Sequence, residues 1–203
     1  MREIQTINAC RLLSGNPVMI LTTSLHERYN AMPLSWAMPC SQEPPCIAIS
    51  LTPSQHTYHV LRETGEFVLN IPNRRMLNRV HALGKATGRH RDKLSELMWP
   101  TRFGRFVRAP YLTDCLAHIE CQVQSHQTVG DRRLFVAQVM VACADAEAFD
   151  THWTEQADTL HYLGGNEYLC QGKILYATDQ TEDLKREAGG GLDLFLRPIE
   201  DLN

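Results

Sequence analysis

The segment CLAHIECQVQ (residues 115–124) carries the clearest structural signal in the chain. Apolar residues occupy every second position and polar residues lie between them, which is the two-residue period of a β-strand with one face on the core. The apolar set is Ala117, Ile119, Cys121 and Val123, and the polar set is His118, Glu120, Gln122 and Gln124. The pattern predicts a half-exposed antiparallel strand.

The residues that follow predict the second arm of a hairpin. Gly130 and Asp131 form a turn signal, and LFVAQVMVACA (134–144) has strand composition. Upstream, four more stretches have the composition of strands: 16–25, 31–37, 46–51 and 66–72. No crossover helix is expected among the first three of these. Many strands with few helices favour an antiparallel β-barrel.

The helices are expected to be short. Ser54 is placed as the N-cap and Gly65 as the C-terminal stop of one helix, and 74–83 and 91–98 are expected to form two others. The predicted fold class is therefore mainly β, with α+β character that comes only from peripheral helices.

Composition limits the domain count and the class of function. The chain has 203 residues, 43% hydrophobic and 21% charged, which predicts one globular domain over 1–180 and an extension over 181–203. With a net charge of −3 the chain has no overall positive potential that would attract a polyanion, which argues against nucleic-acid binding. The longest aliphatic run, Val18–Leu21, is far shorter than the roughly 18 residues of a membrane span, and no signal peptide opens the chain. We expect a cytoplasmic protein without a membrane anchor.

Several chemical motifs are missing from the sequence. It has no GxGxxG strand-to-helix motif, no P-loop, no GxSxG elbow and no HExxH helix. The seven cysteines include no CxxC pair, so we expect reduced thiols that mostly pack as small hydrophobes. His56 and His59 are better read as surface histidines than as ligands. We therefore predict no metal site and assign no catalytic residue.

Five segments in order resemble a known family. They are Asn30–Trp36 as N-x-x-x-x-S-W, Pro44–Ser50 as P-P before a hydrophobic strand, Gly65–Pro72 as G-E-F-V-x-N-x-P, the Asp92–Lys93 pair, and the late hairpin of Ala117–Phe135. Over about 16–168 the chain resembles the flavin reductase-like, FMN-binding split-barrel proteins and their flavoredoxin branch. It departs from the family at Arg132, where relatives often carry the histidine of a G-D-H motif.

The resemblance implies a six-stranded Greek-key split β-barrel with short peripheral helices, non-covalent FMN, a homodimer, and NADH or NADPH as the reductant. Two functions remain open. One is an NAD(P)H-dependent flavin reductase, and the other is a flavoredoxin-type electron carrier whose tightly bound FMN receives electrons from a redox protein partner. A third, weaker reading is a split barrel that binds haem or another cofactor. Neither the terminal acceptor nor the preferred nicotinamide is indicated.

The resemblance also implies a set of cofactor-binding residues. It places Asn30, Met32, Ser35 and Trp36 along the flavin ring, and Ser50, Leu51 and Thr52 near the ribityl phosphate. The remaining candidates are Thr57, Asn70 and Lys93. Thr57 has separate support, since peptide N–H groups and the dipole at a helix N-terminus favour an anion.

Simpler readings of four candidates stay open. Trp36 is either a ring contact or an aromatic residue of the core or the dimer interface. Asn70 is either a ligand or an amide that satisfies backbone groups. Thr57 is either the phosphate anchor or a solvated residue of the first helical turn, and Lys93 belongs either to the site or to a solvated run of charges.

Overall fold

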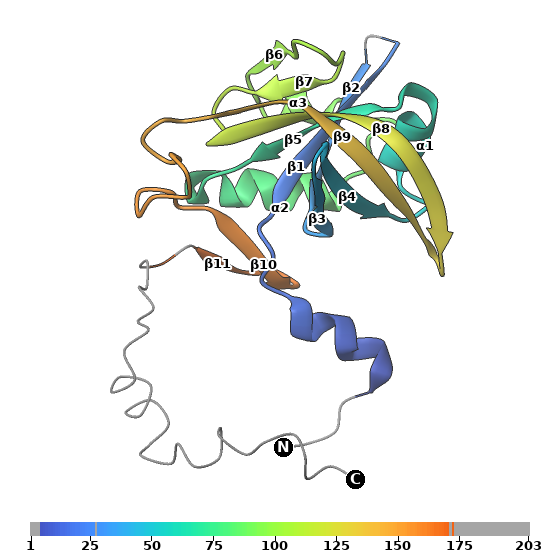
Figure 1. Cartoon of the computed structure of the whole chain (residues 1–203), viewed down its shortest axis with the longest axis horizontal. Coiled ribbons are helices and arrows are strands. Elements are labelled where there is room, and N and C mark those ends of the chain that lie inside the picture. Colours follow the sequence, from blue (N-terminus) through green and yellow to red (C-terminus); the bar gives the residue numbers. More distant parts are fainter. Residues whose placement is uncertain (1–4, 27, 171, 173–203) are drawn as a thin grey trace. The chain divides into compact units, whose positions relative to one another are not determined.

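Seven antiparallel strands form the main sheet of the computed structural model, which describes residues 5–26, 28–170 and 172 (Figure 1). Their order across the sheet is β2-β1-β5-β8-β9-β4-β3. The bounds are β1 Met19–Leu25, β2 Arg28–Leu34, β3 Ala37–Gln42, β4 Pro45–Leu51, β5 Glu66–Ile71, β8 Ala117–Val129 and β9 Arg132–Ala144. In the described residues the edge strands β2 and β3 do not pair with each other, so the barrel is split.

The predicted split barrel is confirmed, with seven strands in the main sheet instead of six. The extra strand is β3, which pairs with β4 at one edge and is largely exposed. Pro39 fits there because an edge strand has one side with no ladder partner to donate to. β2 begins at Arg28 rather than near Ala31, and this earlier start places Asn30 inside the sheet.

Short helices accompany the sheet. They are η1 (Thr6–Leu13), α1 (His56–Thr64), η2 (Arg74–Met76), α2 (Leu77–Lys85) and α3 (Lys93–Glu96). α1 ends as predicted at Gly65, whose φ of 67° lies in the left-handed region that favours glycine. The predicted N-cap was wrong, because Gln55 holds that position without a side-chain cap bond, while Ser54 donates its hydroxyl to Thr52. The helix expected over 91–98 is only the single turn of α3.

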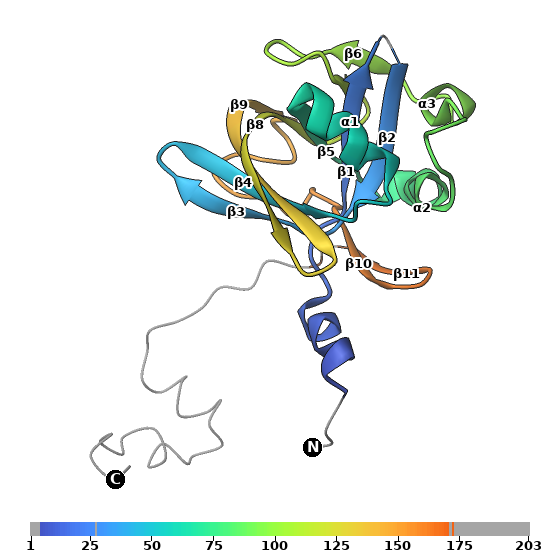
Figure 2. The ribbon, with the colours of Figure 1, turned by 90° about the vertical axis from the view of Figure 1, so that its right-hand side faces the viewer.

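Two small hairpins complete the described fold. β6 (Thr101–Phe103) pairs with β7 (Pro110–Leu112), and β10 (Leu160–Gly164) pairs with β11 (Glu167–Cys170). The second hairpin was not anticipated. It is attached to the residues before β1, where the Val18 N–H donates to the Leu160 carbonyl at 2.8 Å. α2 and α3 both lie against β2 (Figure 2).

The core has two main parts. The cluster inside the barrel includes Leu21, Ile49, Leu51, Phe67 and Phe135. The cluster between β1, β2 and the helices includes Ile20, Ala31, Val80, Leu83 and Leu94. The expectation for the cysteines was only partly right: Cys121 is buried, but Cys10, Cys40 and Cys170 are exposed.

The described helices include none that is both long and apolar enough to span a membrane. All described residues belong to one compact unit. The predicted domain end at 180 and the predicted extension over 181–203 lie outside the described residues.

Glu120 was placed on the exposed face of its strand, but only 1% of its surface is accessible. Its carboxylate accepts backbone N–H groups from Arg105, Phe106 and Val107 at 2.8, 2.7 and 3.2 Å. The loop approaches so closely that a Cβ on Gly104 would lie 2.8 Å from the Glu120 carboxylate. Residues from β6 to β7 therefore cover a strand face that periodicity alone assigns to solvent.

We predict that Glu120→Gln lowers the free energy of unfolding by about 2 kcal/mol, because an amide cannot accept all three buried N–H groups. Urea denaturation measures this change. Glu66→Gln is the matched control. Among the described residues Glu66 accepts the Arg108 N–H alone, and it is more exposed than Glu120, so this variant should lose less than about 1 kcal/mol of unfolding free energy. Equal losses for the two variants would contradict the assignment.

Candidate functional site

A cleft of about 510 Å³ lies beside β2. Its walls are β2, the N-terminal end of α1, the C-terminal half of α2, the loop of residues 86–88, Lys93 and the β10–β11 hairpin. Sites for drug-sized ligands and cofactors typically enclose about 300–1,000 Å³. The cleft therefore has the size of a small-molecule site.

Asn30 and Thr57 join two walls of the cleft. The Asn30 side-chain N–H donates to the Thr57 hydroxyl at 2.8 Å, and the two residues are 6% and 2% exposed. The Asn30 Oδ1 is buried and has no hydrogen-bond partner in the described part of the chain. A Cβ on Gly88 would lie 1.9 Å from that oxygen, so this close approach of the loop requires glycine. A buried acceptor thus remains for a donor on a ligand.

The first turn of α1 faces the same cleft. His56 and Thr57 open the helix, and both line the cleft. The side chain of Gln55 does not cap them, because its oxygen accepts the Thr52 N–H at 2.9 Å. The first peptide N–H groups of a helix lack partners within the helix and form the positive end of its dipole. This wall therefore favours a negatively charged group.

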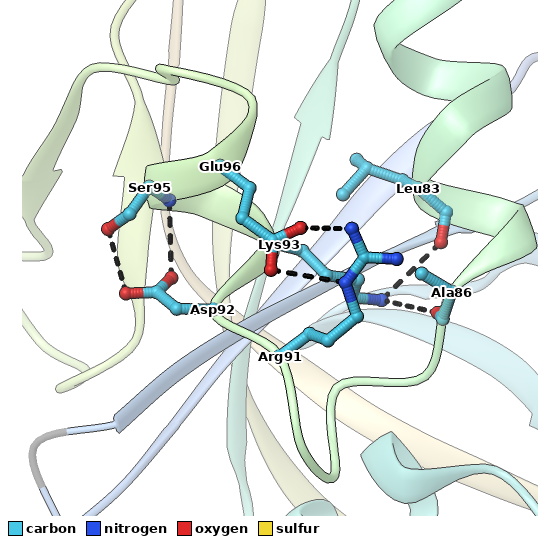
Figure 3. Close-up of polar contacts among 7 residues, drawn as sticks. All are labelled: Leu83, Ala86, Arg91, Asp92, Lys93, Ser95 and Glu96. Carbon is cyan, nitrogen blue, oxygen red and sulfur yellow. Dashed lines mark hydrogen bonds and ion pairs between the residues drawn. The ribbon is translucent and has the colours of Figure 1, made fainter.

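Lys93 supplies a buried charge. It is 5% exposed, and its Nζ donates to the carbonyls of Leu83 at 3.4 Å and Ala86 at 3.2 Å (Figure 3). These carbonyls lie at the C-terminal end of α2, the negative end of its dipole. Burial, and to a smaller extent the charge of Arg91, together lower the pKa of Lys93 to about 8.

The carboxylates beside Lys93 are engaged elsewhere. Asp92 accepts the backbone N–H and the hydroxyl of Ser95, and Glu96 forms a two-bond ion pair with Arg91 (Figure 3). Within the described residues Lys93 forms no ion pair. The cleft therefore contains a buried cation that the described chain does not neutralise.

His56 reflects the same positive surroundings. Its pKa is lowered first by burial and then by nearby cationic groups, of which Arg89 has the largest effect, followed by His59, Lys93 and His90. Burial disfavours a charge of either sign, but the contribution of the nearby cationic groups also favours an anion.

Another part of the cleft lining is aromatic and apolar. Met32, Pro33 and Leu34 contribute from β2, and Tyr162 and Tyr168 contribute from the last hairpin. Tyr168 and His81 form a hydrogen bond at 3.1 Å. Burial raises the pKa of Tyr168, and Tyr162 adds to this effect.

Sequence reasoning missed His81, Gly84, Gly88, Tyr162 and Tyr168. The two glycines carry a detectable signal, since they interrupt a stretch that otherwise has helical character. The two tyrosines carry no such signal in the sequence. They line the cleft because the β10–β11 hairpin, which was not predicted, packs beside it.

The structure brings together five of the ten candidate residues. Asn30, Met32, Ser35, Thr57 and Lys93 line the cleft. Five others lie outside this lining: Trp36, Ser50, Leu51, Thr52 and Asn70. Leu51 is fully buried in the barrel core. Trp36 is 45% exposed, with the Arg132 guanidinium 4.2 Å from its ring centre.

Asn70 has a structural role in this chain. It is fully buried, donates to the Ile20 carbonyl at 2.9 Å and to the Thr22 hydroxyl at 3.2 Å, and accepts the Leu112 N–H at 2.8 Å. Its side chain joins β5 to β1 and β7, which agrees with the alternative reading of an amide that satisfies backbone groups.

Among the described residues, no group of three or more histidine, cysteine, aspartate or glutamate side chains is placed to hold a metal ion. The chemistry of the cleft is that of an anion site joined to an aromatic and apolar compartment.

Comparison with known proteins identifies the family. The model described as flavin reductase like domain matches residues 12–167. The chain is 31% identical over 183 residues to the protein YddH of Escherichia coli (strain K12), covering 86% of this chain and 96% of that one.

Solved structures share the fold. Flavoredoxin from Methanosarcina acetivorans has a TM-score of 0.79 at 21% identity and covers 91% of this chain and 99% of its own. An FMN-binding protein from Thermus thermophilus has a TM-score of 0.78 at 23% identity, with 88% and 98% covered. The family match over residues 12–167, together with the split barrel, shows that the chain belongs to the flavin reductase-like domain family.

Proposed function

We propose that the cleft binds FMN without a covalent bond. The phosphate would lie between the first turn of α1, the Thr57 hydroxyl and Lys93, and the ring would lie toward β2 and Tyr168. The observation that carries this proposal is the buried Lys93 cation beside a helix N-terminus in one cleft. A phosphate dianion would supply the counter-charge that the described chain lacks.

Three further features of the cleft fit this ligand. The unpartnered Asn30 Oδ1 would accept a hydroxyl or imide N–H of the cofactor. Its neighbour Gly88 keeps the loop close without a side chain in the way. The cleft volume of about 510 Å³ also lies in the range of cofactor sites.

We further propose an NAD(P)H-dependent flavin reductase. Bound flavin supplies the capacity to accept two electrons from a nicotinamide and pass them on. The chain's task is then to hold the phosphate, orient the ring and exclude water. The aromatic and apolar end of the cleft, with Met32 and Tyr168, suits the last two tasks. No acid or base of the protein is required by this proposal.

The second candidate is an electron carrier that retains FMN and is reduced by a redox protein partner. Arg132 favours it. The guanidinium stacks on Trp36 and also lies 4.0 Å from Asp131. A guanidinium keeps its charge at physiological pH, so it offers a fixed positive charge where many relatives have a titratable histidine. A fixed surface charge suits docking of an acidic partner.

A homodimer in a cytoplasmic setting belongs to the same proposal. Trp36, directly before the edge strand β3, and Met38, within that strand, are 45% and 58% exposed. Aromatic and methionine side chains are enriched in subunit interfaces.

Anaerobic mixing of the purified protein with FMN and either NADH or NADPH tests the reductase directly. We expect loss of flavin absorbance at catalytic protein concentrations. If neither nicotinamide bleaches the flavin, the reductase proposal fails. Retention of FMN through gel filtration would then favour the carrier, and ready loss of FMN would count against it.

Thr57→Val should weaken FMN binding by about 1 to 3 kcal/mol, because one charge-assisted hydrogen bond is lost. Flavin fluorescence quenching measures the affinity. Thr57→Ser should restore most of it, and Thr64→Val, the same change at the other end of α1, should leave it unaltered. Since Thr57 also accepts from Asn30, thermal unfolding of each variant must show that it is folded. Unchanged affinity in a folded Thr57→Val protein would exclude this phosphate anchor.

FMN affinity should fall as pH rises from 7 to 9.5. The pKa of Lys93 is about 8 in the free protein, so a higher pH removes the proton and with it the cation that attracts the phosphate. We expect a loss of about tenfold, in line with one unit of pKa linkage. Riboflavin, which lacks the phosphate, should show no such loss, and Lys93→Met should bind FMN weakly at both pH values. A pH-independent affinity in the wild type would contradict this role.

A further inference from the structure

Two of the seven cysteines lie on neighbouring strands away from the cleft. Cys40 is on β3 and Cys46 is on β4, and these strands form the antiparallel hairpin at one edge of the main sheet (Figure 1). Neither residue belongs to the cleft lining. The proposed function therefore makes no use of this pair.

The register of the hairpin brings the two cysteines together. Pro39 of β3 pairs with Ile47 of β4. Ser41, two residues later in β3, pairs with Cys46, which is only one residue away from Ile47 in β4. β3 thus contains one extra residue at this point, as in a β-bulge. That residue is Cys40, which therefore lies across from Cys46 and its neighbour.

This placement is within the reach of a disulfide. Residues that face each other in an antiparallel pair have Cα atoms about 4.5 to 5.5 Å apart, and the Cα atoms of a disulfide are about 4.4 to 6.8 Å apart. The two thiols are also close electrostatically. The pKa of Cys40 is raised first by burial and then by the charge of Cys46, an effect that requires a nearby group.

The two thiols differ from the buried ones in their access to reagents. Cys40 is exposed and Cys46 is half-buried. Burial is the largest of the causes that raise the pKa of Cys115 and of Cys121 to about 12. Thiols of this kind stay protonated at neutral pH, and the protonated form does not attack a disulfide. Cys40 can therefore start a reaction with a small disulfide, and Cys46 is placed to complete it.

We propose that Cys40 and Cys46 are a redox-active dithiol, which a low-molecular-weight disulfide converts into a disulfide bridge across the β3–β4 hairpin. This inference goes beyond the proposed function and does not depend on it. In a reducing compartment such a bridge forms transiently and responds to the redox state of the surroundings.

The reaction consists of two thiol–disulfide exchange steps, written here for oxidised glutathione. The Cys40 thiolate attacks one glutathione sulfur, the glutathione S–S bond breaks, and one glutathione thiolate leaves and takes up a proton. The Cys46 thiolate then attacks the Cys40 sulfur of the mixed disulfide, and the second glutathione thiolate leaves and takes up a proton. The two cysteines have then lost two electrons and two protons, and glutathione disulfide has gained them.

The bridge would act on the edge strand. β3 is largely exposed, and in the main sheet its neighbour among the described strands is β4. Directly before β3, the Ser50 N–H donates to the Trp36 carbonyl at 3.0 Å, which holds the first end of the strand. A covalent link at Cys40 would hold the second half as well. Local opening of β3 should therefore become rarer in the oxidised protein.

Oxidation of the reduced full-length protein with oxidised glutathione tests the proposal. Peptide mapping by mass spectrometry should find one bridge, between Cys40 and Cys46, with the loss of two hydrogen atoms and no retained glutathione. The titratable groups beside Cys40 are Cys46 on the packed strand and Glu43 in the turn between the strands. Because the pKa of Cys40 is raised, its initial rate of reaction should rise about tenfold from pH 7 to pH 8, as the thiolate fraction does.

Two variants separate the two steps, and a third is the matched control. C46S should stop at the mixed disulfide, with one glutathione retained on Cys40, and C40S should form no bridge. C10S removes an exposed cysteine outside the hairpin and should form the bridge at the wild-type rate. Oxidation should slow hydrogen exchange of the β3 amides in the wild type and in C10S, but not in C40S. Thermal unfolding checks that each variant is folded.

The proposal is overturned if a glutathione adduct persists on Cys40 in the wild type, if Cys40 links two copies of the chain, or if both thiols stay unreacted. These results are distinct from those of the FMN titrations, which concern residues of the cleft. A failure to bind FMN would leave the dithiol in place, and a failure to form the bridge would leave the FMN proposal in place.

Discussion

A buried lysine without a carboxylate partner among the described residues is the constraint on which this site depends. Transfer of an ammonium group out of water is costly, and the lowered pKa of Lys93 is its direct consequence. The fold offsets part of this cost with the carbonyls of Leu83 and Ala86 at the end of α2. To reach them, α2 and α3 must lie against β2, and that packing creates the cleft. The same contacts therefore hold the helices in place and leave a positive charge for a ligand.

Two buried side-chain atoms, the acceptor Asn30 Oδ1 and the donor N–H of Trp99, have no hydrogen-bond partner among the described residues. Such atoms reduce stability unless a ligand pairs with them. Asn30 lines the cleft that also contains Lys93, and such an arrangement favours ligand binding over maximal stability.

The reductase and the carrier make the same demand on this chain, namely a held phosphate and a shielded ring. They differ in the electron donor that would contact the cofactor: a diffusing nicotinamide nucleotide for the reductase, or a redox protein for the carrier. Membership in the flavin reductase-like domain family agrees with both, since one fold hosts many functions. Arg132 bears most directly on this difference, because a guanidinium is permanently charged and lies against Trp36, at a position where the family resemblance leads us to expect a histidine.

Local sequence patterns determined most of the strands, the late hairpin and the end of α1 at Gly65. These features depend on the alternation of neighbouring side chains and on the conformations open to glycine, which a short segment already shows. Ordered motifs also pointed to Asn30, Thr57 and Lys93. Only the tertiary structure decided that Glu120 is buried, that Asn70 joins strands inside the fold, and that Tyr168 meets His81. These outcomes depend on which distant segments pack together. The periodicity of one segment cannot predict these contacts, because a polar side chain becomes buried only when a distant segment packs over it.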